Sequence, residues 1–223
     1  MFAKLANAKL VFAMSETLIG GNQRLSSPER RGAIIETAIQ LFSERGFRGT
    51  TTREMAAACG VSEPVIYQHF ATKEDLYRAI IDTVSHRDVD RFTSKLFELA
   101  NEGDDQAFFT AAAKLIVDFH QANPAFIRLL HFSALEKHEL AALFIERMSR
   151  EFMGLMSMFM QQRIDDGRFR KVHPLVAAKH FVGGVADYAL WSVICEFKDD
   201  DLPPQEVFLA EVVSMFLNGV RAK

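Results

Sequence analysis

The chain has 223 residues, of which 49% are hydrophobic and 25% charged, a balance typical of globular proteins and unlike that of disordered or fibrous chains. This length suits one large helical domain or a small domain joined to a larger one. The formal net charge of −3 excludes neither DNA binding nor an acidic ligand-binding body, because only the local field matters at a contact.

The first 26 residues are predicted to form an N-terminal extension that is either disordered or helical. Lys9 and Ser15 interrupt its apolar residues, so we expect no signal peptide. Met14 offers an alternative start of translation.

The two cysteines, Cys59 and Cys195, lie far apart and have no metal-type spacing. This pattern favours reduced, buried thiols and a cytoplasmic location. The most apolar later stretch, HFVGGVADYALWSVICEF, contains Asp187 and is too short to cross a bilayer, so no membrane partner is expected.

Apolar residues recur at helical spacing through nearly the whole chain, and no alternating strand pattern appears, which predicts an all-α fold. The first helix is expected to start at Ser27 as N-cap, with Pro28 at the first helical position, and to end at Gly46. Ile34, Ile35, Ala38, Leu41 and Phe42 form its apolar face.

Three helices follow in close succession. Thr51 to Glu54 fits a capping box, in which hydroxyl and carboxylate satisfy each other's free amides at a helix start. Gly60 ends this short helix, Ser62 caps the next, and Thr72 caps a fourth that runs toward Asn101. From Asp104 onward longer helices are predicted, at about 104–121, 124–135, 139–166, 174–197 and 204–221.

The segment from Thr51 to Phe70 has the spacing of a helix-turn-helix. Ala56 is small enough for two helices to approach closely, Gly60 supplies the turn, and Val61 and Ile66 fill the shared core. Such a unit offers its second helix to the major groove of DNA. Because many helical hairpins also have a glycine turn, a purely structural hairpin is the alternative.

The sequence AIQLFSERGFRGTTTREMAAACGVSEPVIYQHFATKEDLYRAII resembles the N-terminal DNA-binding domain of TetR-type transcriptional regulators. The likeness covers about residues 30–81 and combines A-x-x-L-F-x-x-x-G-F, T-T-x-x-x-x-A, G-V-S, Y-x-H-F and K-E-D-L. It implies an all-α protein of about nine helices. Residues 27–75 would form a three-helix DNA-binding domain with a helix-turn-helix, and 76–223 a larger, variable ligand-binding and dimerisation domain.

The resemblance also implies which side chains meet DNA. Phosphates would be held by Thr51 or Thr52, Tyr67, His69 and Lys73, whose hydroxyl, imidazole and ammonium groups suit phosphate oxygens. Base reading would fall to Arg53, Glu63, Pro64 and Val65, next to the capping Ser62. Arg53 can bind guanine O6 and N7, and Val65 and Pro64 suit a thymine methyl. Tyr67 could instead be a half-buried packing residue, and Arg48 either contacts DNA or lies in a solvated loop.

Glu63 and Pro64 make the second helix of this unit begin without a basic residue. A carboxylate at the first helical position complements the positive end of the helix dipole, and proline is tolerated in a first turn. Glu63 could also accept a hydrogen bond from cytosine N4. Residues 28–78 contain seven basic and seven acidic side chains, so we expect DNA binding that weakens at moderate salt.

By the same resemblance, the last two helices should form a homodimer interface, and a four-helix bundle across a twofold axis would result. The alternative is an intramolecular core. The candidate interface residues are Phe181, Gly183, Gly184, Leu190, Trp191, Phe208, Val212, Met215 and Phe216.

Methionine and phenylalanine are abundant in the C-terminal part, where an adaptable Met/Phe-lined cavity would suit a hydrophobic effector. Ordinary core packing explains each of these residues equally well. The candidate pocket residues are Phe108, Phe119, Phe126, Leu130, His131, Phe152, Met153, Met156 and Met160. His120, His131, His138 and His180 show no metal spacing, and surface or core positions are expected for them.

These patterns favour a homodimeric repressor that a small, hydrophobic effector of unknown identity releases from a palindromic DNA operator. A DNA-binding dimer without a small-molecule effector, with a structural or partner-regulated role, is the alternative. An enzyme is not expected, because no nucleophile–base pair, carboxylate dyad, phosphate loop or metal cluster can be assembled from local spacing. We therefore predict no catalytic residues, metal or cofactor.

Overall fold

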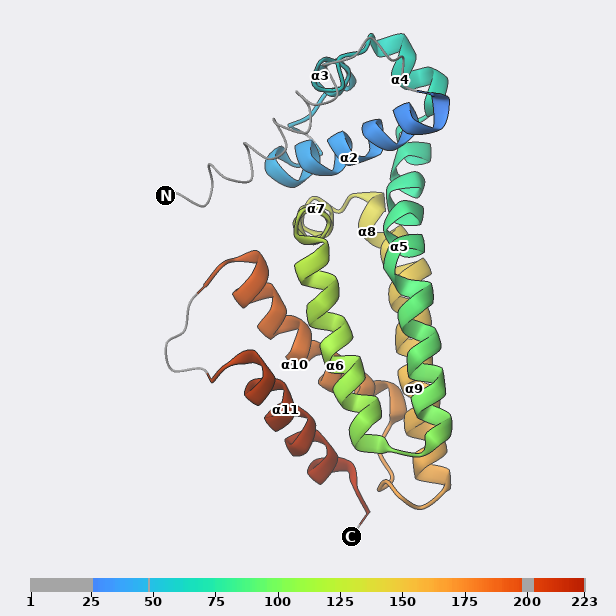
Figure 1. Ribbon diagram of the computed structural model, residues 1–223, viewed down its shortest axis with the longest axis vertical. Helices are drawn as coiled ribbons and strands as arrows, with labels where there is room; N and C mark the ends of the chain where they lie inside the picture. The colour runs from blue at the N-terminus through green and yellow to red at the C-terminus, as the bar shows by residue number, and fades with distance from the viewer. Residues whose placement is uncertain (1–25, 48, 198–202, 223) are drawn as a thin grey trace. The chain divides into compact units, whose positions relative to one another are not determined.

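The computed structural model describes residues 26–47, 49–197 and 203–222, with the backbone alone for residues 85–93, 147 and 148 (Figure 1). The predicted extension up to residue 25 and the candidate DNA contact Arg48 lie outside this description. The helices are α2 Ser27–Arg45, α3 Thr52–Ala58, α4 Glu63–His69, α5 Lys73–Glu102, α6 Asp105–Ala122, α7 Pro124–Leu135, α8 Glu139–Phe144, α9 Arg150–Asp165, α10 Pro174–Ala189 and α11 Gln205–Val220.

Two helices contain a π-helical turn. The segment η1, Ile145–Ser149, joins α8 to α9 without a break, and η2, Leu190–Ile194, extends α10. The predicted helices at 139–166 and 174–197 are thus continuous rods with one widened turn each. Counting each of these two as one helix, the described residues form nine helices, and the predicted all-α fold is confirmed.

Four N-caps were predicted, and two of them form capping boxes. Thr51 and Glu54 form the expected capping box of α3, and Thr72 forms a second box with Asp75 at the start of α5. Ser62 occupies the N-cap position of α4, but its side chain makes no capping hydrogen bond. The expected cap of α2 is wrong by one residue.

Helix α2 already begins at Ser27, one residue before the expected first helical position. Ser26, just outside the helix, binds the Glu29 carboxylate through its amide at 2.8 Å and its hydroxyl at 2.7 Å. This contact lowers the pKa of Glu29. The prediction that a helix starts here is therefore correct, and only the first helical residue was placed one position too late.

Residues Ile34–Lys223 form one compact unit with two hydrophobic cores. The first core joins α2, α3, α4 and the first half of α5 to α7 and Leu140 of α8. The second core joins the end of α5 to α6, α9, α10 and α11. Helix α5 contributes to both cores, so a boundary at residue 75 does not separate one core from the other.

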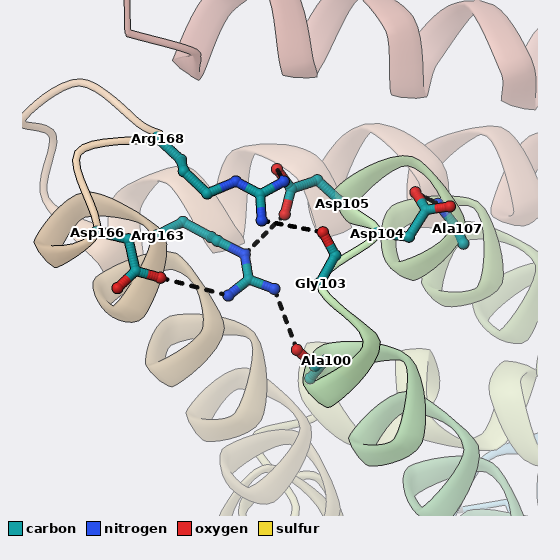
Figure 2. Close-up of polar contacts among 8 residues, drawn as sticks. All are labelled: Ala100, Gly103, Asp104, Asp105, Ala107, Arg163, Asp166 and Arg168. Carbon is teal, nitrogen blue, oxygen red and sulfur yellow. Dashed lines mark hydrogen bonds and ion pairs between the residues drawn. The ribbon is translucent and has the colours of Figure 1, made fainter.

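A buried ion-pair network joins three helical elements at the second core (Figure 2). The Arg163 side chain on α9 and the Asp105 side chain at the start of α6 are only 3% and 5% exposed, with 2.7 Å from Arg163 Nε to Asp105 Oδ1. Arg163 also donates to the Ala100 carbonyl of α5 at 3.1 Å. Arg168 contacts Asp105 Oδ2 at 2.8 Å and donates to the Gly103 carbonyl at 3.0 Å. This network ties α5, α6 and α9 together.

Two further expectations concern the surface. Among the described residues no helix is long and apolar enough to cross a membrane. Cys59 is half-buried, but Cys195 is exposed, so the expectation of two buried thiols is wrong for Cys195. Cys195 directly follows η2, at the position where the helix ends.

Candidate functional site

Helices α3 and α4 form a tight hairpin around Gly60. Gly60 has a φ of +64°, in the left-handed region that glycine adopts without strain. The Val61 amide donates to the Ala56 carbonyl at 3.0 Å across this turn. Met55 and Ile66, 2% and 3% exposed, are buried with Ala56 in the core that includes α2 and the start of α5. The hairpin is thus held by apolar residues beneath it, and its other side chains face outward.

Most of the predicted DNA-contacting side chains lie on the outward side of this hairpin. Tyr67 is 50% exposed, so its ring is not a packing residue of the core. Val65 and His69 are half-buried, and Thr52 is buried. The exposed members are Thr51, Arg53, Ser62, Glu63, Pro64, Tyr67 and Lys73.

Hydroxyl groups differ in their freedom to donate to a phosphate. The Thr51 hydroxyl donates to Glu54 Oε2 at 2.8 Å and accepts from the Glu54 amide at 3.2 Å. The Thr51 amide also donates to Glu54 Oε2 at 2.8 Å, and this bond, followed by the one from the Thr51 hydroxyl, lowers the pKa of Glu54. Because Thr52 is buried and Thr51 is occupied by the capping box, the Ser62 hydroxyl, which makes no capping bond, is better placed to meet a phosphate.

A second candidate site is a pocket of about 380 Å³ among α6, α7, α8, η1, α9 and α10. This volume lies within the usual range of small-molecule sites. Its lining is apolar apart from His120, His131 and Ser149. The lining residues are Leu115, Ile116, Phe119, His120, Ile127, Leu130, His131, Ala134, Ala141, Phe144, Ile145, Ser149, Phe152, Val182 and Ala186.

The structure brings part of the predicted pocket set to this cavity. Phe119, Leu130, His131 and Phe152 line it. Phe108, Met156 and Met160 are fully buried in the second core, where Met153 also packs, and Phe126 is buried in the first core. For these residues the alternative of ordinary core packing is the one observed.

Sequence reasoning missed His120 as a pocket residue. His120 follows Ile116 by four positions and Phe119 by one, so all three lie toward one side of α6, and this spacing was the available signal. Burial lowers the pKa of His120, the bond to the Ile116 carbonyl opposes this shift, and nearby His131 adds to it. The surroundings therefore favour the neutral form of this ring.

Most of the predicted homodimer-interface residues lie on the outer surface of α10 and α11. Gly183, Gly184, Trp191 and Met215 are exposed, and Leu190, Phe208 and Val212 are half-buried. Phe181 and Phe216 are buried, with ring centroids 5.0 Å apart, and belong to the chain's own second core. These two residues thus follow the intramolecular alternative.

A groove crosses this same surface between α10, η2 and α11. It is lined by Gly184, Asp187, Tyr188, Trp191, Ser192, Phe197 and Phe208. Trp191 and Phe197 are 52% and 61% exposed. Exposed aromatic side chains around a groove are typical of protein interfaces.

Two family models match the chain in consecutive segments. Residues 34–80 match the model described as bacterial regulatory proteins of the tetR family. Residues 108–219, half of the chain, match the C-terminal domain of AefR-like transcriptional repressors. The chain belongs to the TetR family. It is a DNA-binding transcriptional regulator, and because this family is not enzymatic, the chain is not an enzyme.

Three curated relatives are similar over half or more of the chain. The nucleoid occlusion factor SlmA of Haemophilus influenzae strain PittGG is 29% identical over 69% of this chain and 71% of its own. The repressor KstR2 of Rhodococcus jostii strain RHA1 is 24% identical over 86% and 91%. The activator FasR of Mycolicibacterium smegmatis is 35% identical over 50% and 51%.

Among solved structures, AibR in complex with isovaleryl coenzyme A and operator DNA is 27% identical, with a TM-score of 0.63 over 84% of this chain and 97% of AibR. A TetR-family regulator from Rhodococcus RHA1 has a TM-score of 0.67 at 23% identity, over 89% of this chain and 100% of that protein. The second likeness supports the fold alone. Within the described part of this chain, no group of three or more His, Cys, Asp or Glu residues could hold a metal ion.

In this TetR-family protein the acidic start of α4 leads to a prediction about base preference. Glu63 is exposed at the first position of the helix that would enter the major groove. If its carboxylate accepts from cytosine N4, Glu63→Gln should change the preferred base at one operator position, by about 1–3 kcal/mol of discrimination. Selection of bound duplexes from a random pool, run with both proteins, measures this change.

Glu74→Gln is the matched control, because Glu74 is also exposed in a first helical turn but binds Arg78 at 2.7 Å. It should leave every base preference unaltered. If Glu63→Gln tightens binding equally at all sequences, Glu63 serves only helix capping and charge balance.

Proposed function

We propose that this chain is a homodimeric TetR-type repressor that a small, uncharged and mainly apolar molecule releases from a palindromic operator. In this proposal residues 27–75 bind DNA, and residues 76–223 bind the effector and form the dimer. The observation that carries it is the apolar pocket and its continuity with the core beneath α3 and α4.

The pocket wall and the DNA-contacting hairpin share one hydrophobic core. Ile127 and Leu130 line the pocket and are buried members of the core that also contains Met55, Ile66 and Leu76. Phe119 and Phe144 line the pocket as well and pack against the same core. Because packed cores transmit displacement, a molecule that fills the pocket would shift the support of α3 and α4. The ligand acts only through its different affinity for the two arrangements.

DNA contact in the proposal comes from Arg53, Glu63, Pro64 and Val65 for bases, and from Ser62, Tyr67, His69 and Lys73 for phosphates. The dimer would use the exposed surface of α10 and α11, including Trp191 and Met215. Two copies of α4 would then lie about 34–36 Å apart, on successive major grooves of a palindrome.

The direction of regulation is proposed from the relatives. KstR2, a repressor, covers 86% of this chain, whereas FasR, an activator, covers 50%. The C-terminal model that matches here also describes repressors. We therefore favour repression.

Acyl-coenzyme A is a second candidate class of effector, because AibR is solved with isovaleryl coenzyme A. The described lining residues include no Lys or Arg that would neutralise coenzyme phosphates. A DNA-binding dimer without an effector is the other alternative, consistent with the likeness to nucleoid occlusion factors. The open apolar pocket favours an uncharged, mainly apolar effector over both of these alternatives.

Selection of bound DNA from random duplexes at low salt tests the proposal. We expect enrichment of a palindrome whose half-sites lie about one helical turn apart. A thermal-shift screen of hydrophobic compounds, followed by competition on the recovered operator, should then find compounds that both stabilise the protein and release DNA. Enrichment of no palindrome would contradict the proposal, and a palindrome that no stabilising compound releases would favour the dimer without an effector.

A further inference from the structure

The pocket has few polar side chains. Among its described lining residues only His120, His131 and Ser149 carry polar side chains, and none is Asp, Glu, Lys or Arg. Ile145 and Ser149, at the two ends of η1, both line the pocket. A ligand in this site would therefore meet hydrocarbon nearly everywhere and a hydrogen-bonding partner at one or two places.

The two histidines have the same local arrangement on neighbouring helices. His120 Nδ1 lies 2.7 Å from the Ile116 carbonyl oxygen on α6. His131 Nδ1 lies 2.8 Å from the Ile127 carbonyl oxygen on α7. A carbonyl oxygen can only accept, so Nδ1 carries the proton in both rings. In a neutral ring the remaining nitrogen, Nε2, is then an acceptor.

The environment favours the neutral form of His120. It is half-buried in an apolar wall, and burial lowers its pKa. The Coulombic interaction with the nearby His131 ring lowers the pKa of His120 further. A neutral Nε2 acceptor cannot bind a carboxylate, and the described lining offers no cation to replace it. An anionic head group would lose its water without gaining a partner.

We propose that His120 Nε2 accepts a hydrogen bond from the effector, which is an uncharged apolar molecule with a hydroxyl or N–H donor. This inference rests on the proposed function, because it specifies the ligand of the same pocket. It excludes simple carboxylates at neutral pH and neutral molecules that can only accept.

Three ten-carbon probes separate these classes: 1-decanol, its isomer 1-methoxynonane, and decanoate. The alcohol and the ether have the same atoms, and only the alcohol can donate. Isothermal titration of the full chain at pH 7.5, without DNA, should show the alcohol binding about 3- to 10-fold more tightly than the ether, which is the usual net value of one hydrogen bond. Decanoate should bind at least about tenfold more weakly than the alcohol, because a carboxylate is costly to desolvate.

Two variants test the role of His120. His120→Phe keeps a flat ring but removes the acceptor, so the alcohol and the ether should bind equally. His120→Gln keeps an acceptor and should retain part of the preference for the alcohol. His180→Phe is the control, because His180 is exposed on α10 and does not line the pocket. It should bind the three probes as the unmodified chain does.

The outcomes separate this inference from the proposed function. The inference would be overturned by equal binding of the alcohol and the ether, by tightest binding of decanoate, or by an unchanged preference in His120→Phe. It would also be overturned if another compound releases the chain from DNA while none of the three probes binds. Selective binding of the alcohol without release of the operator would support the inference and contradict effector control. Failure to enrich a palindrome bears on the function alone.

Discussion

Replacing Asp105 with alanine is expected to lower the free energy of unfolding by about 3 kcal/mol, near the lower end of the values for breaking a buried ion pair. The cost arises because the Arg163 guanidinium stays buried after its partner at 2.7 Å is removed. Some compensation remains. The Ala100 carbonyl lies 3.1 Å away, Asp166 lies 3.7 Å away, and the Phe159 ring lies 4.4 Å beneath the guanidinium carbon. Figure 2 shows the polar groups that would be left around Arg163.

Urea unfolding followed by circular dichroism, at one fixed protein concentration, measures this loss. The double variant Asp105→Leu with Arg163→Met should recover most of it, because an apolar pair of similar volume leaves no unpaired charge. Asp118→Ala is the control. Asp118 binds Lys114 at 3.0 Å on an exposed face of α6, so its loss should cost less than about 1 kcal/mol. A similar small cost for Asp105→Ala would show that water or a shifted side chain satisfies Arg163.

The sequence predicted those features that depend on a few neighbouring residues. Thr51 with Glu54 forms the expected capping box, and Thr72 caps its helix as expected, with Asp75 completing a second box; each lies within four positions of one chain segment. Gly60 has the positive φ that the turn requires. The order of the helices and most of their ends follow from such local signals, which explains why the all-α fold was predictable.

Features that depend on distant segments were not predictable in the same way. Asp105 and Arg163 are 58 positions apart, and nothing near either residue indicates the other. Phe108 and Phe119 both occupy inward positions of α6, yet Phe108 stacks on Phe159 at 3.7 Å while Phe119 lines the pocket. Helical periodicity indicates which face is covered, but it does not indicate whether the space opposite is filled. The same reason explains why Phe181 and Phe216 lie in the chain's own core.

The π-helical turns were also missed, although they affect the site. An extra residue in a turn leaves the apolar pattern nearly continuous, so 139–166 still reads as one helix. In the structure, η1 places Ile145 and Ser149 on the pocket wall. Such widened turns are frequent at functional sites, and here one lies where the effector is proposed to bind.

The turn between α7 and α8 connects the pocket to the support of the DNA-contacting hairpin. Both of its helices line the pocket, through Ala134 and Ala141 among others. Two hydrogen bonds of Ser133 stabilise the turn. Its hydroxyl donates to the His138 carbonyl at 3.2 Å and accepts from the Ala141 amide at 2.8 Å. A ligand that displaces either helix would therefore displace His138.

The His138 ring lies against two aromatic residues of the other elements in this core. It stacks on Phe47, just after α2, with 3.8 Å between ring centroids and 4° between planes. It meets the Tyr77 ring of α5 edge-on at 4.5 Å. Burial lowers the pKa of His138, which favours the neutral ring for this stack. Burial also raises the pKa of Tyr77 to about 12, so its hydroxyl stays protonated.

We expect His138→Ser to weaken effector-induced release of the operator while leaving DNA affinity without effector nearly unchanged. Serine preserves the N-cap of α8, where His138 Nδ1 now accepts from the Leu140 amide at 3.3 Å, but it removes the ring that contacts Phe47 and Tyr77. The coupling free energy between two sites is commonly about 1–3 kcal/mol. We therefore expect the factor by which the effector weakens operator binding to fall roughly 5-fold or more. Fluorescence anisotropy of labelled operator, with and without the releasing compound, measures it.

Phe132→Ala is the matched control, because Phe132 lies on α7 near the same turn but is 37% exposed. It should leave release intact. Titration of the effector without DNA must show that His138→Ser still binds it with the original affinity, since otherwise the pocket itself has changed. If the effector binds and releases DNA as before, the signal crosses the core through Ile127, Leu130 and Phe144. The aromatic stack would then contribute to stability alone, by about 0.5–1.5 kcal/mol for each ring pair.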